Sequence, residues 1–279
     1  MTSVAVVTGA NQGLGLALVR GLARRLGEEG VVYLTARDRG RGEAAVRLLE
    51  GEGLRVRLHL LDVRDEASVE ALAETVRTEH GGVDVLISNA AARITPDRPQ
   101  SEQVREFVDT NNHGTYRMIR AFTPLLNDGA RFVVVASSFG SLTNLPTGLH
   151  PRFDERSVSP EEIEAAMDEY AALVEAGQAK IKGWPDWINI PSKVAQVAAV
   201  RVLARQLGEE AGKRDVLVAA ACPGLVDTEA SRPWFASMAG ALSPDEAAVD
   251  VLWLACAPAG SREGHGELVQ HRRVLPYRF

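Results

Sequence analysis

The chain is poor in the residues that mark disulfide scaffolds, metal sites and membrane proteins. Only 2 of its 279 residues are cysteine. Cys222 and Cys256 stand apart in apolar surroundings, without the spacing of metal ligands. We therefore expect reduced, buried thiols and no bound metal. No apolar run approaches the length that spans a bilayer, so we expect no membrane segment.

Basic charge is scarce relative to acidic charge. The 31 lysine and arginine residues are outnumbered by 37 aspartate and glutamate residues, which gives a net charge of −6. Because there is also no basic run, we expect neither nucleic acid nor an anionic membrane as a partner. The start, MTSVAVVTG, lacks the basic segment and the cleavage site of a signal peptide, so we expect a cytoplasmic protein.

What the chain does contain is a regular alternation of strand-like and helical segments. Short β-branched runs lie at 4–9, 31–37, 55–63, 83–90, 130–137 and 215–224, and segments of helical period lie at 13–26, 40–51, 65–80 and 101–126. This alternation predicts an α/β fold with a Rossmann-type, doubly wound parallel sheet and helices on both faces. With 46% hydrophobic residues, 1–279 is expected to form a single domain.

One long segment interrupts the alternation. About fifty residues separate Ser137 from the helix near 192, far more than a usual connection. Within them, Ser159 has the position of an N-cap with Glu162 three residues later, and Gly177 can end the helix. We therefore expect a folded helical lid, inserted at 141–188 over the C-terminal edge of the sheet.

A glycine-rich turn follows the first strand. TGANQGLG has the spacing G-x3-G-x-G at the start of the first helix, whose free N–H groups attract a pyrophosphate. An ordinary strand-to-helix turn is the simpler explanation, but the position within a βαβ unit favours dinucleotide binding. The candidate cofactor contacts here are Gly9, Asn11, Gln12, Gly13, Leu14 and Gly15.

The end of the second strand predicts which dinucleotide binds. An acidic residue there would bond the ribose hydroxyls and repel a 2′-phosphate, whereas this sequence has TARDRGRG. Arg37 is placed to pair with a 2′-phosphate and Arg41 to add a second contact, although Arg41 could also be a solvated loop charge. Asp38 lies one residue further and could act as the ribose acid. The pattern favours NADPH/NADP+ over the non-phosphorylated form.

Later strand ends supply further candidate cofactor contacts. Asp62 can bond the adenine amino group and the Val63 backbone its ring nitrogen, while small residues after the fourth strand let the chain pass beneath the cofactor. The loop after the sixth strand, CPGLVDT, can wrap the nicotinamide end. Strand-end packing and a plain surface loop are the alternatives. The remaining candidates are Asn89, Ala90, Ala91, Pro223, Gly224, Val226 and Thr228.

These motifs, in this order, resemble the short-chain dehydrogenase/reductase family, and most closely its carbonyl reductases with a long insertion before the catalytic helix. The resemblance extends over nearly the whole chain, from TGANQGLG through SNAA, TNNHG and PSK to CPGLVDT. In that family a tyrosine protonates the substrate oxygen and a serine bonds it. A lysine lowers the tyrosine pKa and holds the nicotinamide ribose, and an asparagine keeps a water link to the lysine.

The resemblance implies catalytic roles for Asn111, Ser138 and Lys193, with Ser137 as second choice for the serine. Lys193 would also contact the cofactor. At the tyrosine position the chain has Asn189. An amide is too weak an acid to release a proton at neutral pH, although it can donate a hydrogen bond. The general acid of the family is therefore missing.

Three sources could replace the missing proton. Water is one, and Tyr170 in the insertion is another, although a tyrosine on an apolar stripe is more often part of a core. The third is the substrate, because a ketone beside a phenol or enol carries its own donor at high effective concentration. A positioned acid contributes roughly 10²–10⁴-fold, so its loss need not abolish reduction.

Aromatic residues make up only 5% of the chain, yet several gather in the insertion and after the sixth strand. Broad apolar walls suit a flat polycyclic ligand. The alternative is that the tryptophans pin the insertion to the core. The candidate substrate contacts are Phe139, Met167, Tyr170, Trp187, Asn189 and Trp234.

The residues and the resemblance together predict an NADPH-dependent ketoreductase of a secondary-metabolite pathway such as antibiotic biosynthesis, acting on a polycyclic aromatic, angucyclinone-like polyketide. A catalytically inactive NADP(H)-binding sensor or partner protein is the alternative, although it would need neither Ser138 nor Asn111. An isomerase or dehydratase is a further possibility that no residue selects. Because the insertion can cover the helix through which related enzymes pair, we expect a monomer.

Overall fold

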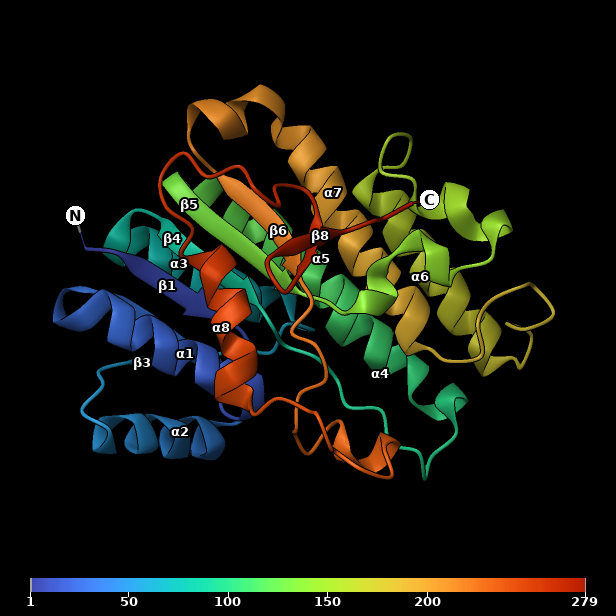
Figure 1. The fold of residues 1–279 in the computed structure, drawn as a ribbon, viewed down its shortest axis with the longest axis horizontal. Helices are drawn as coiled ribbons and strands as arrows, with labels where there is room; N and C mark the ends of the chain where they lie inside the picture. Colours follow the sequence, from blue (N-terminus) through green and yellow to red (C-terminus); the bar gives the residue numbers. More distant parts are fainter. Residues whose placement is uncertain (1, 279) are drawn as a thin grey trace.

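An eight-stranded sheet in the order β3-β2-β1-β4-β5-β6-β7-β8 forms the centre of the structure, a computed structural model that describes residues 2–278 (Figure 1). The strands are β1 (Val4–Val7), β2 (Val31–Ala36), β3 (Arg57–Leu60), β4 (Val83–Ser88), β5 (Leu126–Val135), β6 (Leu217–Ala221), β7 (Leu268–Gln270) and β8 (Arg273–Leu275). All pairs are parallel except β7 with β8. The predicted doubly wound sheet is confirmed; the short antiparallel edge strand is an addition to it.

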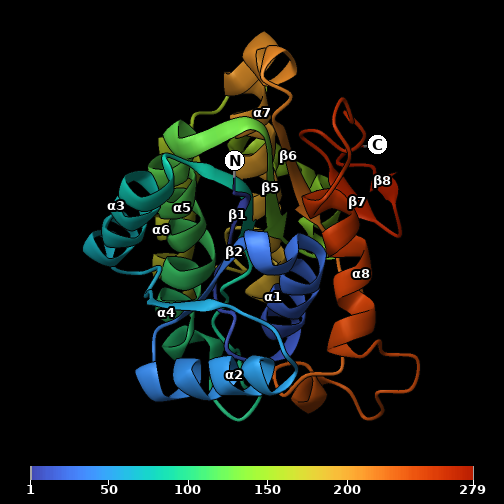
Figure 2. The ribbon, with the colours of Figure 1, turned by 90° about the vertical axis from the view of Figure 1, so that its left-hand side faces the viewer.

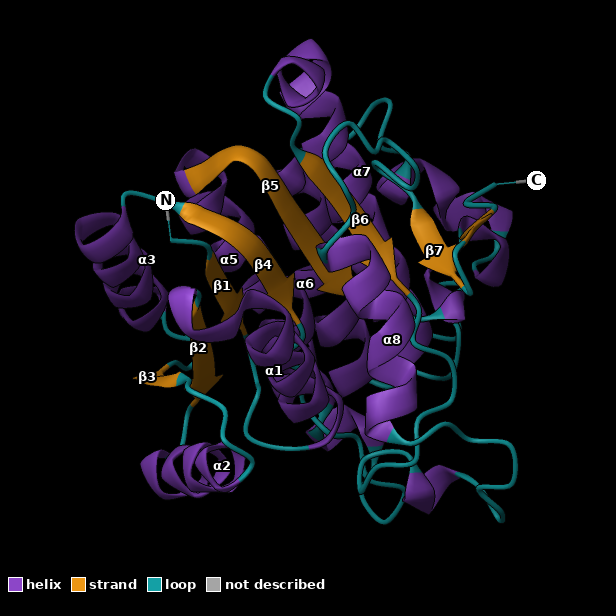
Figure 3. Ribbon diagram, turned by 60° about the vertical axis from the view of Figure 1, so that its left-hand side comes forward, coloured by secondary structure: helices purple, strands orange, loops and turns teal. Residues whose placement is uncertain are grey.

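Helices cover both faces of this sheet (Figures 2 and 3). One face carries α1 (Gly13–Leu26), α2 (Arg39–Gly51) and α8 (Pro244–Ala255), and the other carries α3 (Glu66–His80), α4 (Val104–Val108), α5 (Gly114–Phe122) and α7 (Asn189–Lys213). An apolar core lies on each face of the sheet, and alternate residues of β1 pack into one core or the other, because successive strand side chains point to opposite faces. Ala5 and Val7 pack with α1 and α8, whereas Val4 and Val6 pack with the other layer.

Several short helical turns connect these elements. They are η1 (Gly27–Glu29), η2 (Gln100–Glu102), η3 (Asp109–His113), η4 (Thr123–Leu125), η5 (Ser138–Gly140), η6 (Leu142–Asn144), η7 (Thr147–Phe153) and η8 (Arg232–Trp234). The helix predicted at 101–126 is thus divided into η2, α4, η3, α5 and η4, and η3 is a π-helical turn. Such widened turns often occur at functional sites, and this one contains Asn111.

The insertion folds around α6 (Pro160–Glu175). Its predicted capping box is confirmed, since the Ser159 side chain accepts from the Glu162 backbone and the Glu162 side chain from the Ser159 backbone. The apolar stripe of α6 is buried against α4 and α7. α6 thus covers the outer helical layer, which has an apolar surface to bury. That the insertion lies over the C-terminal edge of the sheet stays a prediction.

The part of the chain that the structure describes contains no helix long and apolar enough to cross a membrane. Within residues 2–278 there is also no group of three or more histidine, cysteine, aspartate or glutamate side chains placed to hold a metal ion. Cys222 is buried and Cys256 half-buried, and both are free thiols.

Candidate active site

The glycine turn between β1 and α1 is built for close backbone approach. Gly9 and Gly13 have φ of 61° and 54°, a region that favours glycine. A Cβ on Gly15 would lie 2.4 Å from the Gly9 carbonyl oxygen. The Asn89 amide donates to the Thr8 and Gly9 carbonyls at 2.9 and 3.1 Å, so it fixes the turn. Gln12, the N-cap of α1, makes no side-chain cap, which leaves the first N–H groups of α1 free for an anion.

A cleft of about 1100 Å³ runs along this turn and the neighbouring strand ends. Most predicted cofactor residues line it: Gly9, Asn11, Gln12, Gly13, Leu14, Gly15, Arg37, Arg41, Asp62, Val63, Asn89, Ala90, Ala91 and Thr228. Lys193, Pro223, Gly224 and Val226 do not belong to its lining. A long cleft with a glycine floor, a helix N-terminus and arginines at one end fits a dinucleotide that carries a 2′-phosphate.

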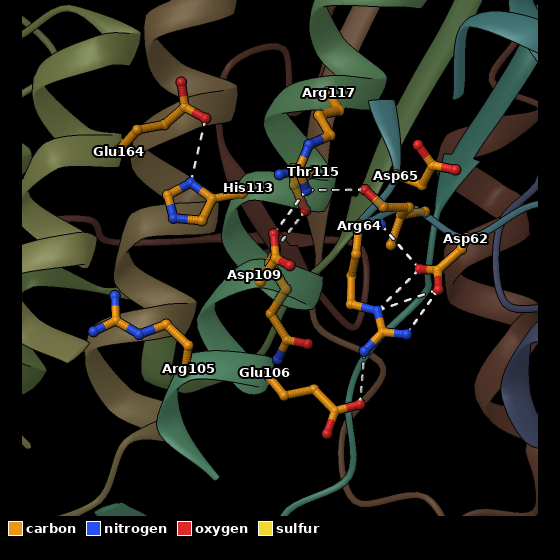
Figure 4. A network of polar contacts seen from close by, with 12 residues as sticks. Asp62, Arg64, Asp65, Arg105, Glu106, Asp109, His113, Thr115, Arg117 and Glu164 are labelled. Atoms are coloured by element: carbon orange, nitrogen blue, oxygen red, sulfur yellow. Dashed lines mark hydrogen bonds and ion pairs between the residues drawn. The ribbon is translucent and has the colours of Figure 1, made fainter. Parts of the chain in front are cut away.

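Charged residues that follow β2 and β3 or lie on α4 line the end of the cleft where the adenine is expected. Figure 4 shows Arg64 between Asp62 and Glu106. Arg64 pairs with Asp62 at 2.7 Å and with Glu106 of α4 at 3.0 Å, and Glu106 also lies 3.6 Å from Arg37. The Arg64 guanidinium holds the pKa of Asp62 below its usual range. Asp62 therefore carries an ion pair in addition to its predicted adenine contact.

Asp38 is engaged in capping a helix. Its Oδ1 accepts a 2.8 Å hydrogen bond from the Arg41 backbone at the start of α2. Among the described residues, in contrast, the exposed Arg37 side chain has one partner, Glu106, at 3.6 Å. Arg37 is thus the side chain free to turn toward a 2′-phosphate, while the Asp38 carboxylate is occupied by the backbone.

The two candidate serines differ in what their hydroxyls do. Ser137 Oγ accepts from the Phe139 backbone at 3.3 Å and caps η5. Ser138 is exposed and lines a second cavity of about 570 Å³ between η5, η6 and the β7–β8 hairpin. Burial raises the pKa of the Cys222 thiol, which lies beside Ser138. Ser138 is therefore the serine that can reach a ligand.

Lys193 and Asn189 lie one turn apart on the same face of α7, four residues from each other. The Lys193 ammonium is buried and donates to the Val135 carbonyl at 3.3 Å and to Gln196 Oε1 at 2.7 Å. Burial lowers the pKa of Lys193 to about 8. Asn189 is half-buried, and none of the described residues bonds its amide, which is free to donate to a ligand.

Asn111 is held rigidly within η3. Its Oδ1 accepts from the Ala92 backbone at 2.8 Å, which joins η3 to the segment after β4. The backbone carbonyl oxygen of Asn111 accepts from Thr115 Oγ1 at 2.6 Å and from Gln196 Nε2 of α7 at 2.9 Å. The three candidates Asn111, Ser138 and Lys193 therefore come from three elements that meet at the carboxyl ends of β4, β5 and β6.

The candidate aromatic residues form two separate groups. Trp187 packs on Phe139 with ring centroids 5.1 Å apart and on Trp234 at 5.8 Å, near the strand ends. Tyr170 instead packs on Trp184 at 4.6 Å inside the lid. Met167 and Tyr170 have no exposed surface, so this structure brings them into the core and not into an open pocket.

Sequence patterns did not identify several residues that border the site. Gln196 bonds the Lys193 ammonium and Thr115 bonds Gln196, while Arg64 and Glu106 border the adenine end. Gln196 could have been found, because it is a polar residue within the apolar stretch VAQVAAV of α7. The second cavity lies partly against the β7–β8 hairpin, which the pattern did not predict. Its lining by Asn144, Gln270 and the residues from Leu275 onward was therefore missed.

The short chain dehydrogenase family matches residues 3–147. The chain is 36% identical over 278 residues to carbonyl reductase (NADPH) 1 of Bos taurus, covering 98% of each protein, and 35% identical over 275 residues to that of Homo sapiens, covering 97% of each.

Two solved structures from plants also resemble this one. Salutaridine reductase from Papaver somniferum has a TM-score of 0.80 at 26% identity, covering 94% of this chain and 98% of that chain. Menthone neomenthol reductase from Mentha piperita has a TM-score of 0.78 at 26% identity, covering 96% and 98%. The predicted resemblance is confirmed over the full chain. The chain belongs to the short-chain dehydrogenase family.

Proposed function

We propose that this protein reduces a ketone of a polycyclic aromatic, angucyclinone-like polyketide, with the proton drawn from the substrate itself. The class of reaction follows from the family: the chain is an NADPH-dependent oxidoreductase, and the relatives at 34–36% identity are named carbonyl reductases. NADPH supplies the hydride when it is bound. The substrate class and the origin of the proton are the new parts of the proposal.

The observation that carries the proposal is the contrast between Asn189 and its neighbours. Ser138 keeps an exposed hydroxyl for a carbonyl oxygen, and Lys193 is buried one helical turn from Asn189. At Asn189, the position where the family resemblance expects the tyrosine, there is an amide that can orient a ketone but cannot protonate it. Tyr170, the other phenol considered, is buried against Trp184, and burial raises its pKa above the usual value. A proton donor on the substrate would replace the acid that the protein lacks at this position.

The cavity beside Ser138 supports a multi-ring substrate. Its volume of about 570 Å³ lies within the range of ligand pockets for drug-sized molecules. Phe139, Leu275 and Pro276 give it apolar walls, while Asn144 and Gln270 offer hydrogen bonds at its margin. Such a lining suits a flat aromatic system with a few oxygen substituents.

A comparison of paired substrates tests the proton source. Ketones with an adjacent phenol should be reduced at least about 10²-fold faster than matched methyl ethers, the size of a general-acid contribution. NADPH oxidation is followed for both series at the same pH. Equal rates for phenol and ether would assign the proton to water or to the protein. NADPH binding without turnover of any ketone would favour a cofactor-binding sensor instead.

Variants of Asn189 give a second test of the same mechanism. Asn189→Ala should lower the rate by about tenfold or less, since it removes one modest hydrogen bond. Asn189→Tyr should not accelerate the phenolic substrates, which carry their own donor, but can accelerate the methyl ethers. Acceleration of both series by the tyrosine would contradict the substrate-derived proton.

We also infer a monomer located in the cytoplasm. The packing of α6 on α4 and α7 supports the first inference, because it occupies the outer surface of these helices. The free thiols of Cys222 and Cys256 support the second. A tetramer in light scattering at micromolar concentration, or recovery of the protein outside the cytoplasmic fraction, would contradict them.

A further inference from the structure

A side chain occupies the space between the Lys193 ammonium and the Asn111 carbonyl. Gln196 Oε1 accepts from Lys193 Nζ at 2.7 Å, and Gln196 Nε2 donates to the Asn111 carbonyl oxygen at 2.9 Å and to Thr115 Oγ1 at 3.1 Å. Gln196 is 3% exposed and Thr115 2% exposed. The contact joins α7 to η3 and α5, which lie side by side in the fold (Figure 1).

Chemistry determines the orientation of this amide. A lysine ammonium can only donate and a backbone carbonyl can only accept. The oxygen of Gln196 must therefore face Lys193 and its nitrogen must face Asn111, as observed. Thr115 donates its own hydrogen to the Asn111 carbonyl at 2.6 Å and accepts from Gln196, so every polar atom of the bridge has a partner.

We propose that Gln196 is a positioning residue that holds the Lys193 ammonium by a direct amide bridge to Asn111, so that Lys193 serves as a fixed cationic anchor for the cofactor and not as part of a proton supply. The cofactor contact of Lys193 is what the family resemblance implies, and the proposal rests on the proposed function. An amide donates and accepts at different atoms and does not pass a proton on at neutral pH. A water molecule between Lys193 and Asn111 would do so, but Gln196 fills that position.

The energetic role of the bridge follows from burial. An ammonium out of water is unstable unless hydrogen bonds replace its hydration. Two acceptors serve Lys193, and the Val135 carbonyl is the more distant of them at 3.3 Å. Among the described residues, the titratable group that acts on the Lys193 ammonium is the Cys222 thiol, which follows β6. The groups of η3, α5 and β5 that take part in the Lys193–Gln196 contacts do not titrate; they are the Asn111 backbone carbonyl, the Thr115 hydroxyl and the Val135 carbonyl. Gln196 is therefore the main partner of the charged form.

The protonation of Lys193 can be measured directly, because the chain has only four lysines. Lys180, Lys182 and Lys213 are exposed, whereas Lys193 is buried, so its signal is identified by an unusual midpoint. Protein labelled with ¹³C at the lysine Cε atoms and saturated with NADP+ is titrated by NMR. The variants are Gln196→Met, which keeps the volume without an acceptor, and Gln196→Glu, which keeps the acceptor and adds a charge.

The two variants should move the Lys193 midpoint in opposite directions. Gln196→Met should lower it by about one to two pH units, the size of a hydrogen bond to a charged group. Gln196→Glu should raise it by about one unit or more, and this variant carries the test if the methionine variant fails to fold. Lys182→Arg is the control that leaves the midpoint unchanged.

A midpoint that moves by less than about 0.3 units in both variants, even with a lowered Tm, would reduce Gln196 to a structural residue and overturn the proposal. A downward shift in the glutamate variant would overturn it as well. No ketone enters the measurement. A protein that reduces none of the proposed substrates therefore leaves this result unaffected, and the two proposals fail separately.

Discussion

The replacement Arg37→Ala tests how the protein selects a phosphorylated cofactor. The Arg37 side chain is 61% exposed and pairs with Glu106 at 3.6 Å. An exposed pair of this kind contributes about 0–1 kcal/mol, so its loss should hardly change the free energy of unfolding. A charge-assisted bond to a 2′-phosphate contributes about 1.5–3 kcal/mol, which corresponds to a roughly 10- to 150-fold increase in the Kd for NADPH. NADH has no such phosphate, and its Kd should stay unchanged.

Glu106 provides the complementary variant. Its carboxylate competes for Arg37 and also pairs with Arg64 at 3.0 Å, while the Arg64–Asp62 pair at 2.7 Å persists without it. Glu106→Gln should therefore tighten NADPH by up to about fivefold, the size of an exposed ion pair, and leave NADH unchanged. Together the two variants separate the attraction of Arg37 for the 2′-phosphate from the competition by the Glu106 carboxylate.

Calorimetric titration with NADPH and NADH at fixed ionic strength measures both effects. Arg39→Ala is the matched control, because Arg39 is 70% exposed, lies two residues from Arg37 and has Glu43 at 4.0 Å as its one charged partner within residues 2–278. Equal weakening of NADPH and NADH by Arg37→Ala would show that Arg37 does not recognise the 2′-phosphate. A loss as large in Arg39→Ala would show that general charge, and not this site, attracts the cofactor.

Three further predictions concern the lid and the cofactor turn. Burial opposes protonation of His113, but the Glu164 and Asp168 carboxylates on α6 outweigh burial and raise the pKa of His113. The contribution of the charged His113 to stability is therefore complete below about pH 6.5 and is lost as the pH rises through the raised pKa. His113→Asn should therefore lower Tm more near pH 6 than near pH 9, and equal losses would contradict this. The Tyr170 hydroxyl is buried without a partner among the described residues, so Tyr170→Phe should keep or raise Tm and leave ketone reduction unchanged, whereas a loss above about tenfold would make Tyr170 the proton source. Gly15→Ala should abolish NADPH binding in a folded protein, since its Cβ would meet the Gly9 carbonyl at 2.4 Å, and normal binding would refute the close approach at this turn.

Local chemistry explains what could be predicted from the sequence. The glycines of the first turn, the buried strands and the capping box at Ser159 are each determined by neighbouring residues, and each forms as expected. The β7–β8 hairpin could not be predicted in this way. Its strands have three residues each, and β7 is held by pairing with β6, almost fifty residues earlier in the chain.

The lid shows a different limit of sequence patterns. The stripe of Ile163, Met167 and Tyr170 correctly indicates which face of α6 is buried, but a stripe does not say what covers it. Tertiary packing decides between a ligand and the protein, and here α4 and α7 cover these side chains. The network of Asp62, Arg64 and Glu106 has the same origin, because 42 residues separate the last two.

The two unusual residues on α7 have a common explanation. Asn189 lies four residues before Lys193 and Gln196 three residues after it, so both share its face of the helix. In the family that the chain resembles, a tyrosine supplies the proton and an asparagine keeps a water link to the lysine. Without the tyrosine, a water link to Lys193 leads to no general acid. Gln196 fills the space between Lys193 and the Asn111 backbone carbonyl and bonds the ammonium. On the proposed function, α7 thus keeps the lysine that is expected to hold the cofactor and has neither the tyrosine nor the water link, which agrees with a substrate that carries its own donor.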